Sequence, residues 1–272
     1  SLNAFKKTLE SMLESMESIK DYYLRLKRVP IYKKGQLPAV DELLQDMSDD
    51  AIAEINAYGF EDELKKHFDK GLVFIPADQL RPDFIIHLNH DIALLKQIHQ
   101  QWFAQGMPFD PKLANFASEI KRQLSEDKSR KIVVFSEYTD TASYVFESIA
   151  RDPSIRAIYY SSAESSTVRT LIKENFDASS EKQKNDYDII ITTDALSEGV
   201  NLNRAGTVFN YDIPYNPTRV IQRVGRINRI GKMLFDTLYI YNYFPTDIGE
   251  GHIRKKEIST LKKAMIDVLL GE

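Results

Sequence analysis

The chain has 272 residues, of which 43% are hydrophobic and 28% charged, so it can bury one large core or two smaller ones as an ordinary soluble globular protein. Its formal net charge of −4 and pI of about 5.8 exclude a general attraction to nucleic acid or to an anionic membrane, and any such binding must come from a local cluster of charge. The absence of cysteine excludes disulfides, thiolate metal sites and a cysteine nucleophile, and it favours the reducing cytoplasm as the compartment.

The start of the chain indicates a segment of a longer protein. It opens on Ser1-Leu2, with neither an initiator methionine nor the pattern of a signal peptide. No apolar run approaches the ~18 residues that a membrane-spanning helix needs, so we expect no membrane partner.

The first part of the chain, up to about residue 126, has the periodicity of helices. Apolar side chains recur every three or four residues from Phe5 to Leu26, which predicts one long amphipathic helix. Shorter helices are predicted around residues 40–70, 78–104 and 110–125. The last of them has a start signal, with Asp110 as N-cap and Pro111 at the first helical position. We assign residues 1–126 to an α-helical region that acts as an insertion or linker.

Residues 127–272 have a different texture, in which short apolar runs alternate with helical segments. The predicted strands are residues 131–135, 156–160, 187–192, 206–211 and 237–244. The predicted helices are residues 140–150, 165–176, 195–199 and 217–230, with a final amphipathic helix around 258–269. Because the strands lack in/out alternation, they are expected to be buried on both faces. The pattern predicts a doubly wound, mostly parallel α/β domain, whose ligands bind at the carboxyl ends of the strands.

The segment NPTRVIQRVGRINRIGK, residues 216–232, contains five cations and no acidic residue. Asn216 can cap its helix, Pro217 suits the first turn, and Gly231 supplies a stop. One predicted face, toward the sheet, holds Val220, Ile221, Val224 and Ile227. The opposite predicted face holds Arg219, Gln222, Arg223, Arg226 and Arg229.

This arrangement carries costs that suggest an external anion. Like charges three and four residues apart repel by a few tenths of a kcal/mol per pair, and Gly225 costs about 1 kcal/mol against alanine within a helix. A plain solvated basic face is the alternative. The preference for arginine, which grips phosphate in two places, and the missing side chain at Gly225, which permits close approach, favour binding of an anion from outside the domain.

Four segments resemble motifs of superfamily 2 helicases and translocases. QRVGRINRIG at 222–231 resembles motif VI, ITTDALSEGVNL at 191–202 resembles motif V, and KIVVFSEYTDT at 131–141 resembles motif IV. SSTVRTLIKENF at 165–176 is similar to the helix that follows motif IV. All four are in the family's order and spacing. The stretch NYDIPYNPTRVIQRVGRINRIG is similar to bacterial Swi/Snf-like proteins.

The resemblance implies that residues 127–272 form the second, RecA-like lobe of a motor in which ATP lies between two lobes. The phosphate-binding loop and the Mg²⁺-binding acidic box are absent from the chain, so they are expected in a first lobe of the same parent protein. ATP and Mg²⁺ are the implied cofactors, and nucleic acid, double-stranded DNA above all, is the implied partner. The family places Arg226 and Arg229 as catalytic arginine fingers and Gln222 beside the nucleotide. The isolated chain is expected to have no ATPase activity.

Motifs IV and V supply the remaining expected contacts. The residues expected at nucleic acid are Ser136, Tyr138, Thr139, Thr193, Asp194, Ser197 and Arg223. The residues expected to couple to the nucleotide are Glu198, Gly199 and Asn201. Several alternatives remain open. Thr193 or Asp194 can cap an ordinary turn, Thr139 or Asp140 can cap a helix, and Arg223 or Arg219 can form a salt bridge within the lobe.

Other functions are less well supported. His87, His90 and His99 have no persuasive fourth ligand, so no metal site is expected. The main alternative function is an ATP-independent module that docks nucleic acid or a partner and derives from a helicase lobe. A stand-alone Rossmann-type enzyme ranks last, because no G-x-G-x-x-G follows a strand.

Overall fold

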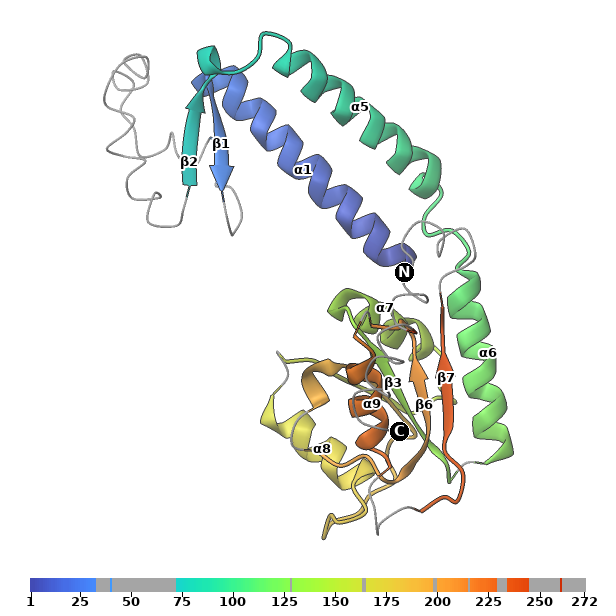
Figure 1. Cartoon of the computed structure of the whole chain (residues 1–272). Helices are drawn as coiled ribbons and strands as arrows, with labels where there is room; N and C mark the ends of the chain where they lie inside the picture. Colours follow the sequence, from blue (N-terminus) through green and yellow to red (C-terminus); the bar gives the residue numbers. More distant parts are fainter. Residues whose placement is uncertain are drawn as a thin grey trace. The chain divides into compact units, whose positions relative to one another are not determined.

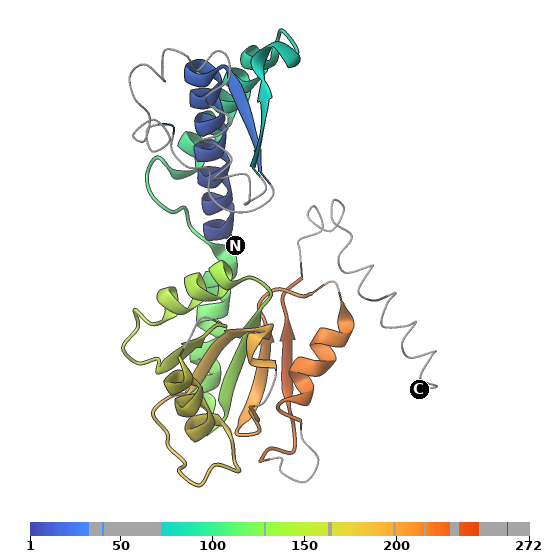
Figure 2. The ribbon, with the colours of Figure 1, turned by 90° about the vertical axis from the view of Figure 1, so that its left-hand side faces the viewer.

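The computed structural model describes residues 1–32, 40, 72–127, 129–162, 165–197, 200–214, 216–228, 234–244 and 260. The chain divides into two compact units, Ser1–Pro108 and Phe109–Glu272 (Figures 1 and 2). Among the helices of the described ranges, none combines the length and the apolar character needed to cross a membrane.

In its described residues, the first unit contains two antiparallel helices and a short strand pair. α1 (Leu2–Leu26) lies along α5 (Phe84–Phe103), with the ring centres of Phe5 and Trp102 5.6 Å apart at one end and those of Tyr23 and Phe84 5.7 Å apart at the other. This agrees with the predicted long helix. The segment predicted at residues 40–70 lies outside the described residues, apart from Val40.

The strand pair of this unit was not predicted. β1 (Arg28–Tyr32) pairs antiparallel with β2 (Leu72–Pro76), and the 3₁₀ turn η1 (Ala77–Gln79) follows. The sequence prediction treated Pro30 as a break, but a two-stranded ribbon consists only of edge strands, which tolerate proline.

The second unit is built on the predicted parallel sheet. Its strands are β3 (Lys131–Ser136), β4 (Ala157–Tyr160), β5 (Ile189–Thr193), β6 (Ala205–Asn210) and β7 (Tyr239–Asn242). They stand in the order β4-β5-β3-β6-β7, and every neighbouring pair is parallel. All five predicted strands are therefore confirmed, and the central one, β3, is the strand of motif IV.

Helices cover both faces of this sheet (Figure 2). α6 (Pro111–Glu126) and α7 (Thr139–Ile149) pack on one face, and α8 (Ser166–Phe176) packs on the other. Leu196 of η2 (Asp194–Ser197) and Ile227, just beyond α9 (Pro217–Gly225), join the core on the α8 side. Successive side chains of a strand point to opposite faces, so Val133 belongs to the α8 core and Val134 to the α6 core. The doubly wound fold class is confirmed.

Helix α6 belongs to the sheet unit. Asp110 caps it, accepting a hydrogen bond from the N–H of Leu113 at 3.0 Å, and Pro111 opens it as predicted. Phe116 and Ile120 are fully buried in the core beneath the sheet. The boundary between the units consequently lies before α6, whereas the sequence analysis placed it after this helix.

The amino-terminal edge of the sheet is fixed by two cations. Lys131 is 4% exposed and donates to the carbonyl oxygen of Tyr187; burial, with Arg204 nearby, lowers the pKa of Lys131 to about 8. Arg130 lies over Gly206, where a side chain would meet its Cγ at 2.7 Å, and its guanidinium carbon is 4.5 Å from the ring centre of Phe235. These contacts stabilise the amino-terminal ends of the strands, whereas ligands are expected at the carboxyl ends.

Candidate functional site

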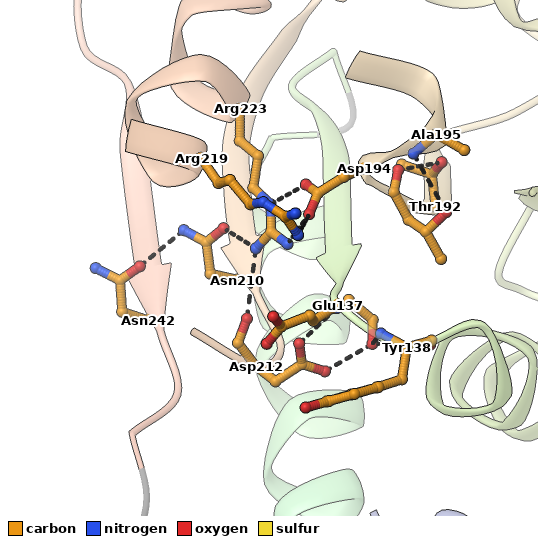
Figure 3. A network of polar contacts seen from close by, with 12 residues as sticks. Glu137, Tyr138, Thr192, Asp194, Ala195, Asn210, Asp212, Arg219, Arg223 and Asn242 are labelled. Atoms are coloured by element: carbon orange, nitrogen blue, oxygen red, sulfur yellow. Dashed lines mark hydrogen bonds and ion pairs between the residues drawn. The ribbon is translucent and has the colours of Figure 1, made fainter. Parts of the chain in front are cut away.

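The carboxyl ends of neighbouring strands meet at the other edge of the sheet, where parallel α/β folds bind their ligands. β3 ends at Ser136, β5 runs directly into Asp194, and Asp212 follows β6. Helix α9 joins the same edge through Arg219 and Arg223, as Figure 3 shows. Motifs IV, V and VI thus come together in space.

Arg223 is the centre of a polar network at this edge. Its side chain is 0% exposed, and its guanidinium donates to both carboxylate oxygens of Asp194, at 2.6 Å from Nε to Oδ1 and 3.1 Å from Nη2 to Oδ2. Nη1 donates to Oδ1 of Asn210 at 3.0 Å, and Nδ2 of Asn210 donates to Oδ1 of Asn242 at 2.7 Å. A single arginine therefore ties α9 to β5 and β6 and, through Asn210, to β7.

The two faces predicted for the arginine segment are wrong in part. The prediction placed Arg223 outward and Ile221 toward the sheet, whereas Arg223 is fully buried and Ile221 is 51% exposed. The contacts of Arg223 with Asp194 and Asn210 show that α9 is turned so that this residue, and not Ile221, faces the sheet. Asp194 makes this burial tolerable by pairing with the charge. The intramolecular salt bridge is thus the arrangement present, and the buried guanidinium faces no open surface that nucleic acid would reach.

Arg219 contacts the same carboxylate from outside. Its Nη1 lies 3.4 Å from Oδ2 of Asp194, and half of its side chain is exposed. Asp194 therefore pairs with two arginines of α9, closely with the buried one and loosely with the exposed one.

Arg226 differs from both. Its side chain is half-buried, and its guanidinium has no hydrogen-bond or ion-pair partner among the residues that the structure describes. Its backbone is fixed, since its N–H donates to the carbonyl of Arg223 at 3.2 Å and its carbonyl accepts from the N–H of Leu202 at 3.0 Å. A methyl group added at the neighbouring Gly225 would meet nothing within 4 Å. The site thus offers a fixed cation beside an open surface; Arg229 lies outside the described residues.

The turn before α7 holds the motif IV residues. Ser136 is 1% exposed, and its hydroxyl donates to Oδ2 of Asp212 at 2.6 Å, so it supports the turn rather than facing a ligand. Tyr138 is 54% exposed, Thr139 is also exposed, and no side chain caps the start of α7. Of the expected contacts in this motif, Tyr138 and Thr139 are the accessible ones.

The motif V residues follow the carboxyl end of β5, next to the motif IV turn. The hydroxyl of Thr193 accepts from the N–H of Ala195 at 3.3 Å, which is the turn-capping arrangement. Asn201 is half-buried and Gln222, on α9, is exposed. The side chain of Ser197 and the residues Glu198 and Gly199 lie outside the described part of the chain.

Two tyrosines, one buried and one half-buried, support the strand ends. Tyr211 follows β6 and is fully buried in the core. Its hydroxyl has no hydrogen-bond partner in the described ranges. Burial raises the pKa of Tyr211 well above its usual range and the pKa of Tyr243 to about 12, so both stay neutral. Their rings, 5.7 Å apart, pack below the edge without adding charge to it.

Three network residues were missed from the sequence: Asn210, Asp212 and Asn242. Each lies at or just beyond the carboxyl end of a predicted strand, and that position is the signal that could have found them. The histidines considered for a metal are on α5, where His87 lies 3.0 Å from Asp83 and His99 lies 3.2 Å from Glu10. Within the described ranges, no group of three or more potential ligands could hold a metal ion.

Comparison with known families agrees with this arrangement. Residues 112–231 match the family model described as "Helicase conserved C-terminal domain". These residues are therefore similar to helicase C-terminal domains. In the structure the domain runs from the start of α6 past the end of α9, and β7 completes its sheet beyond the matched range.

Curated relatives are similar over parts of this domain. The chain is 30% identical over 125 residues to the Bacillus subtilis "Uncharacterized ATP-dependent helicase YqhH", covering 46% of this chain and 21% of that protein. It is 42% identical over 50 residues to the Helicobacter pylori "DEAD-box ATP-dependent RNA helicase RhpA", covering 18% and 10%. It is 27% identical over 106 residues to the Neurospora crassa "ATP-dependent DNA helicase mph1", covering 38% and 9%. The chain therefore spans about a fifth or less of these relatives.

Two solved structures are similar over most of the chain. The C-terminal part of the Fun30 ATPase domain has a TM-score of 0.45 at 18% identity, covering 95% of this chain and 86% of that one. The Pyrococcus furiosus Hef helicase domain has a TM-score of 0.41 at 18% identity, covering 92% and 40%.

Proposed function

We propose that this chain is the second motor lobe of an ATP-dependent helicase or translocase of the Swi/Snf-like type, acting on double-stranded DNA. The observation that carries the proposal is Arg226, a cation whose backbone is fixed and whose guanidinium has no partner in the described residues. A cation held in this way suits a lobe that closes on a triphosphate.

The buried Arg223 explains how the half-buried Arg226 is held. Its bidentate contact with Asp194 locks α9 to the sheet, so that Arg226, three residues further on, starts from a fixed position. Preorganised charge of this kind costs no rearrangement when negative charge develops in a reaction. The open space at Gly225 leaves room for another body beside the helix.

The residues present fit a nucleotide only in part. Arg226, with Arg229, would face the γ-phosphate, and Gln222, Glu198, Gly199 and Asn201 would lie toward the nucleotide. ATP supplies the phosphoanhydride bond, and Mg²⁺, held mainly by the first lobe, neutralises its charge. The described residues contain no group of three or more histidine, aspartate or glutamate side chains that could hold a metal ion, and the proposal places Mg²⁺ in the first lobe.

Nucleic acid would lie over the strand ends, against the exposed Tyr138 and Thr139 and the motif V loop. Contacts of this kind reach the backbone, so binding should depend on salt and not on sequence. The names of the relatives include both a DNA and an RNA helicase, and duplex DNA is proposed from the Swi/Snf-like resemblance of residues 210–231.

The test is arginine replacement in the full-length parent protein. Arg226→Ala and Arg229→Ala should each lower ATP turnover by about 10³-fold while ATP binding changes little, because a finger acts on the transition state. Arg151→Ala, an exposed arginine beyond the end of α7, is the matched control and should keep full turnover. Normal hydrolysis in both finger variants would refute the proposal.

The same protein distinguishes the substrates and the alternative function. Turnover measured with duplex DNA, single-stranded DNA and RNA should be stimulated most by the duplex. Nucleic-acid binding without any ATP turnover would instead identify an ATP-independent docking module.

A further inference from the structure

Asp212, just beyond β6, holds the turn that precedes α7. Its Oδ1 accepts from the backbone N–H of Glu137 at 2.5 Å, and its Oδ2 accepts from the hydroxyl of Ser136 at 2.6 Å. The same hydroxyl oxygen accepts from the N–H of Tyr138 at 3.2 Å. Three consecutive residues of the turn are thus fastened, directly or through one hydroxyl, to one carboxylate (Figure 3).

The backbone of Asp212 contacts the arginine helix. Its carbonyl oxygen accepts from Nη1 of Arg223 at 3.4 Å, and the same Nη1 donates to Asn210 at 3.0 Å. Asp212 is therefore the one residue of the described network that touches both the turn before α7 and the central arginine of α9 (Figure 3).

Neither helix depends on this carboxylate for its packing. α7 is anchored by the buried side chains of Ala142, Val145 and Ile149 in the core under the sheet. α9 is anchored by Arg223, which has Asp194 and Asn210 as closer partners than Asp212. Loss of the Asp212 carboxylate would release the turn and leave both helices in place.

We propose that Asp212 is a positioning residue that couples the nucleic-acid side of the lobe to its nucleotide side. Tyr138 and Thr139 stand exposed beyond the turn that the Asp212 carboxylate holds, and the backbone carbonyl of Asp212 contacts Arg223. Arg223 in turn fixes the backbone of Arg226 through their hydrogen bond of 3.2 Å. Binding at the turn is thereby transmitted to the arginine expected at the γ-phosphate. This inference rests on the function proposed above.

The experiment measures coupling in the full-length parent protein. The quantity is the stimulation ratio, the ATP turnover with saturating duplex DNA divided by the turnover without it. Asp212→Ala removes both acceptors and should lower the ratio by about tenfold or more, because hydrogen bonds to a charged acceptor are among the stronger ones. Asp212→Asn keeps one acceptor oxygen and should fall between Asp212→Ala and the wild type. Asp236→Asn, an exposed aspartate on the loop before β7, is the charge-matched control and should stay within twofold.

The ratio separates coupling from a merely structural role. If Asp212→Ala lowers both turnovers equally, or keeps the ratio within twofold, the proposal is overturned. If Asp212→Ala fails to fold, Asp212→Asn and Ser136→Ala, which removes one of the two hydrogen bonds, decide by the same ratio.

A second readout keeps this inference apart from the proposed function. If the wild-type protein shows no stimulation at all, the proposed function fails, and amide hydrogen exchange in Asp212→Ala then tests the link alone. Faster exchange both at Glu137 and at the amide of Arg226, which donates to the carbonyl of Arg223, supports it, and faster exchange at Glu137 alone overturns it.

Discussion

Replacing Arg223 by methionine should destabilise the sheet unit more than any other single change on α9. The substitution keeps much of the side-chain volume but removes the guanidinium, which leaves the carboxylate of Asp194 and Oδ1 of Asn210 without their main donor. Breaking a buried ion pair by removing one partner costs about 3–5 kcal/mol. We expect about 3 kcal/mol, the low end, because Asp194 is 24% exposed and Arg219 stays within 3.4 Å.

In a unit of this size, 1 kcal/mol shifts Tm by roughly 2–4 °C, so Arg223→Met should lower Tm by roughly 6–12 °C. Urea titration of the chain, followed by near-UV circular dichroism of its tyrosines, measures the loss. The single tryptophan, Trp102, lies in the other unit, so its fluorescence transition should stay unchanged and serve as an internal control.

The matched variant is Arg219→Met, which removes a half-exposed arginine with one long contact and should cost less than about 1 kcal/mol. If Arg223→Met costs no more than Arg219→Met, the buried pair does not hold α9 and the reasoning about the site fails. The double variant with Asp194→Leu should lose less than the sum of the two single losses, since no buried charge remains unpaired.

Three further predictions concern a glycine at each edge and the buried lysine. The methyl group of Gly225→Ala meets nothing within 4 Å, so this substitution should stabilise the isolated chain by up to about 1 kcal/mol in urea titration. It should lower the ATP turnover of the full-length protein, because the methyl group occupies the space proposed for a partner beside the helix. Unchanged turnover would contradict the proposed close approach at Gly225. Gly206→Ala places Cβ 2.7 Å from Cγ of Arg130 and should cost about 1–3 kcal/mol, which the same titration measures. In the folded chain the pKa of Lys131 is lowered to about 8, so above pH 8 the unfolded chain holds a proton that the folded chain lacks. The free energy of unfolding should therefore rise by up to about 1.4 kcal/mol per pH unit until the pKa of the unfolded state is reached. Titrations between pH 8 and 9.5 should show this rise in the wild type and a flatter dependence in Lys131→Met, and equal slopes would count against it.

Strand prediction succeeded in the second unit because its central strands β3, β5 and β6 are buried on both faces and appear in the sequence as continuous apolar runs, whereas the outer strand β7, also predicted, is mostly exposed. The residues of β3 and β5 are buried throughout, and no helix-period pattern competes with them. In the first unit β1 and β2 are a small ribbon joined by a long connection, and Pro30 concealed the first strand. Pairing between segments so far apart leaves no local signal.

The structure brings motifs IV, V and VI together at the carboxyl ends of the strands, but the direction of Arg223 on its helix was not predicted. A helical wheel treats every arginine as outward, because it carries no information about a carboxylate elsewhere in the chain. Asp194 is 29 residues from Arg223 and comes from another strand end, and that distant partner reverses the environment of the arginine. Asn210, Asp212 and Asn242 were missed for the same reason, since each acquires its role only from neighbours in the folded sheet.

The position of β7 at the end of the sheet, next to β6, decides where a fragment of this domain can end. The family match stops at residue 231, but β7 runs alongside β6 from Tyr239 to Asn242 and supplies the acceptor for the amide of Asn210. A fragment trimmed to the matched range would expose the whole hydrogen-bonding side of a long apolar strand, and unpaired strands of that kind recruit further copies of themselves. Expression of the lobe for crystallisation should therefore extend at least through Phe244.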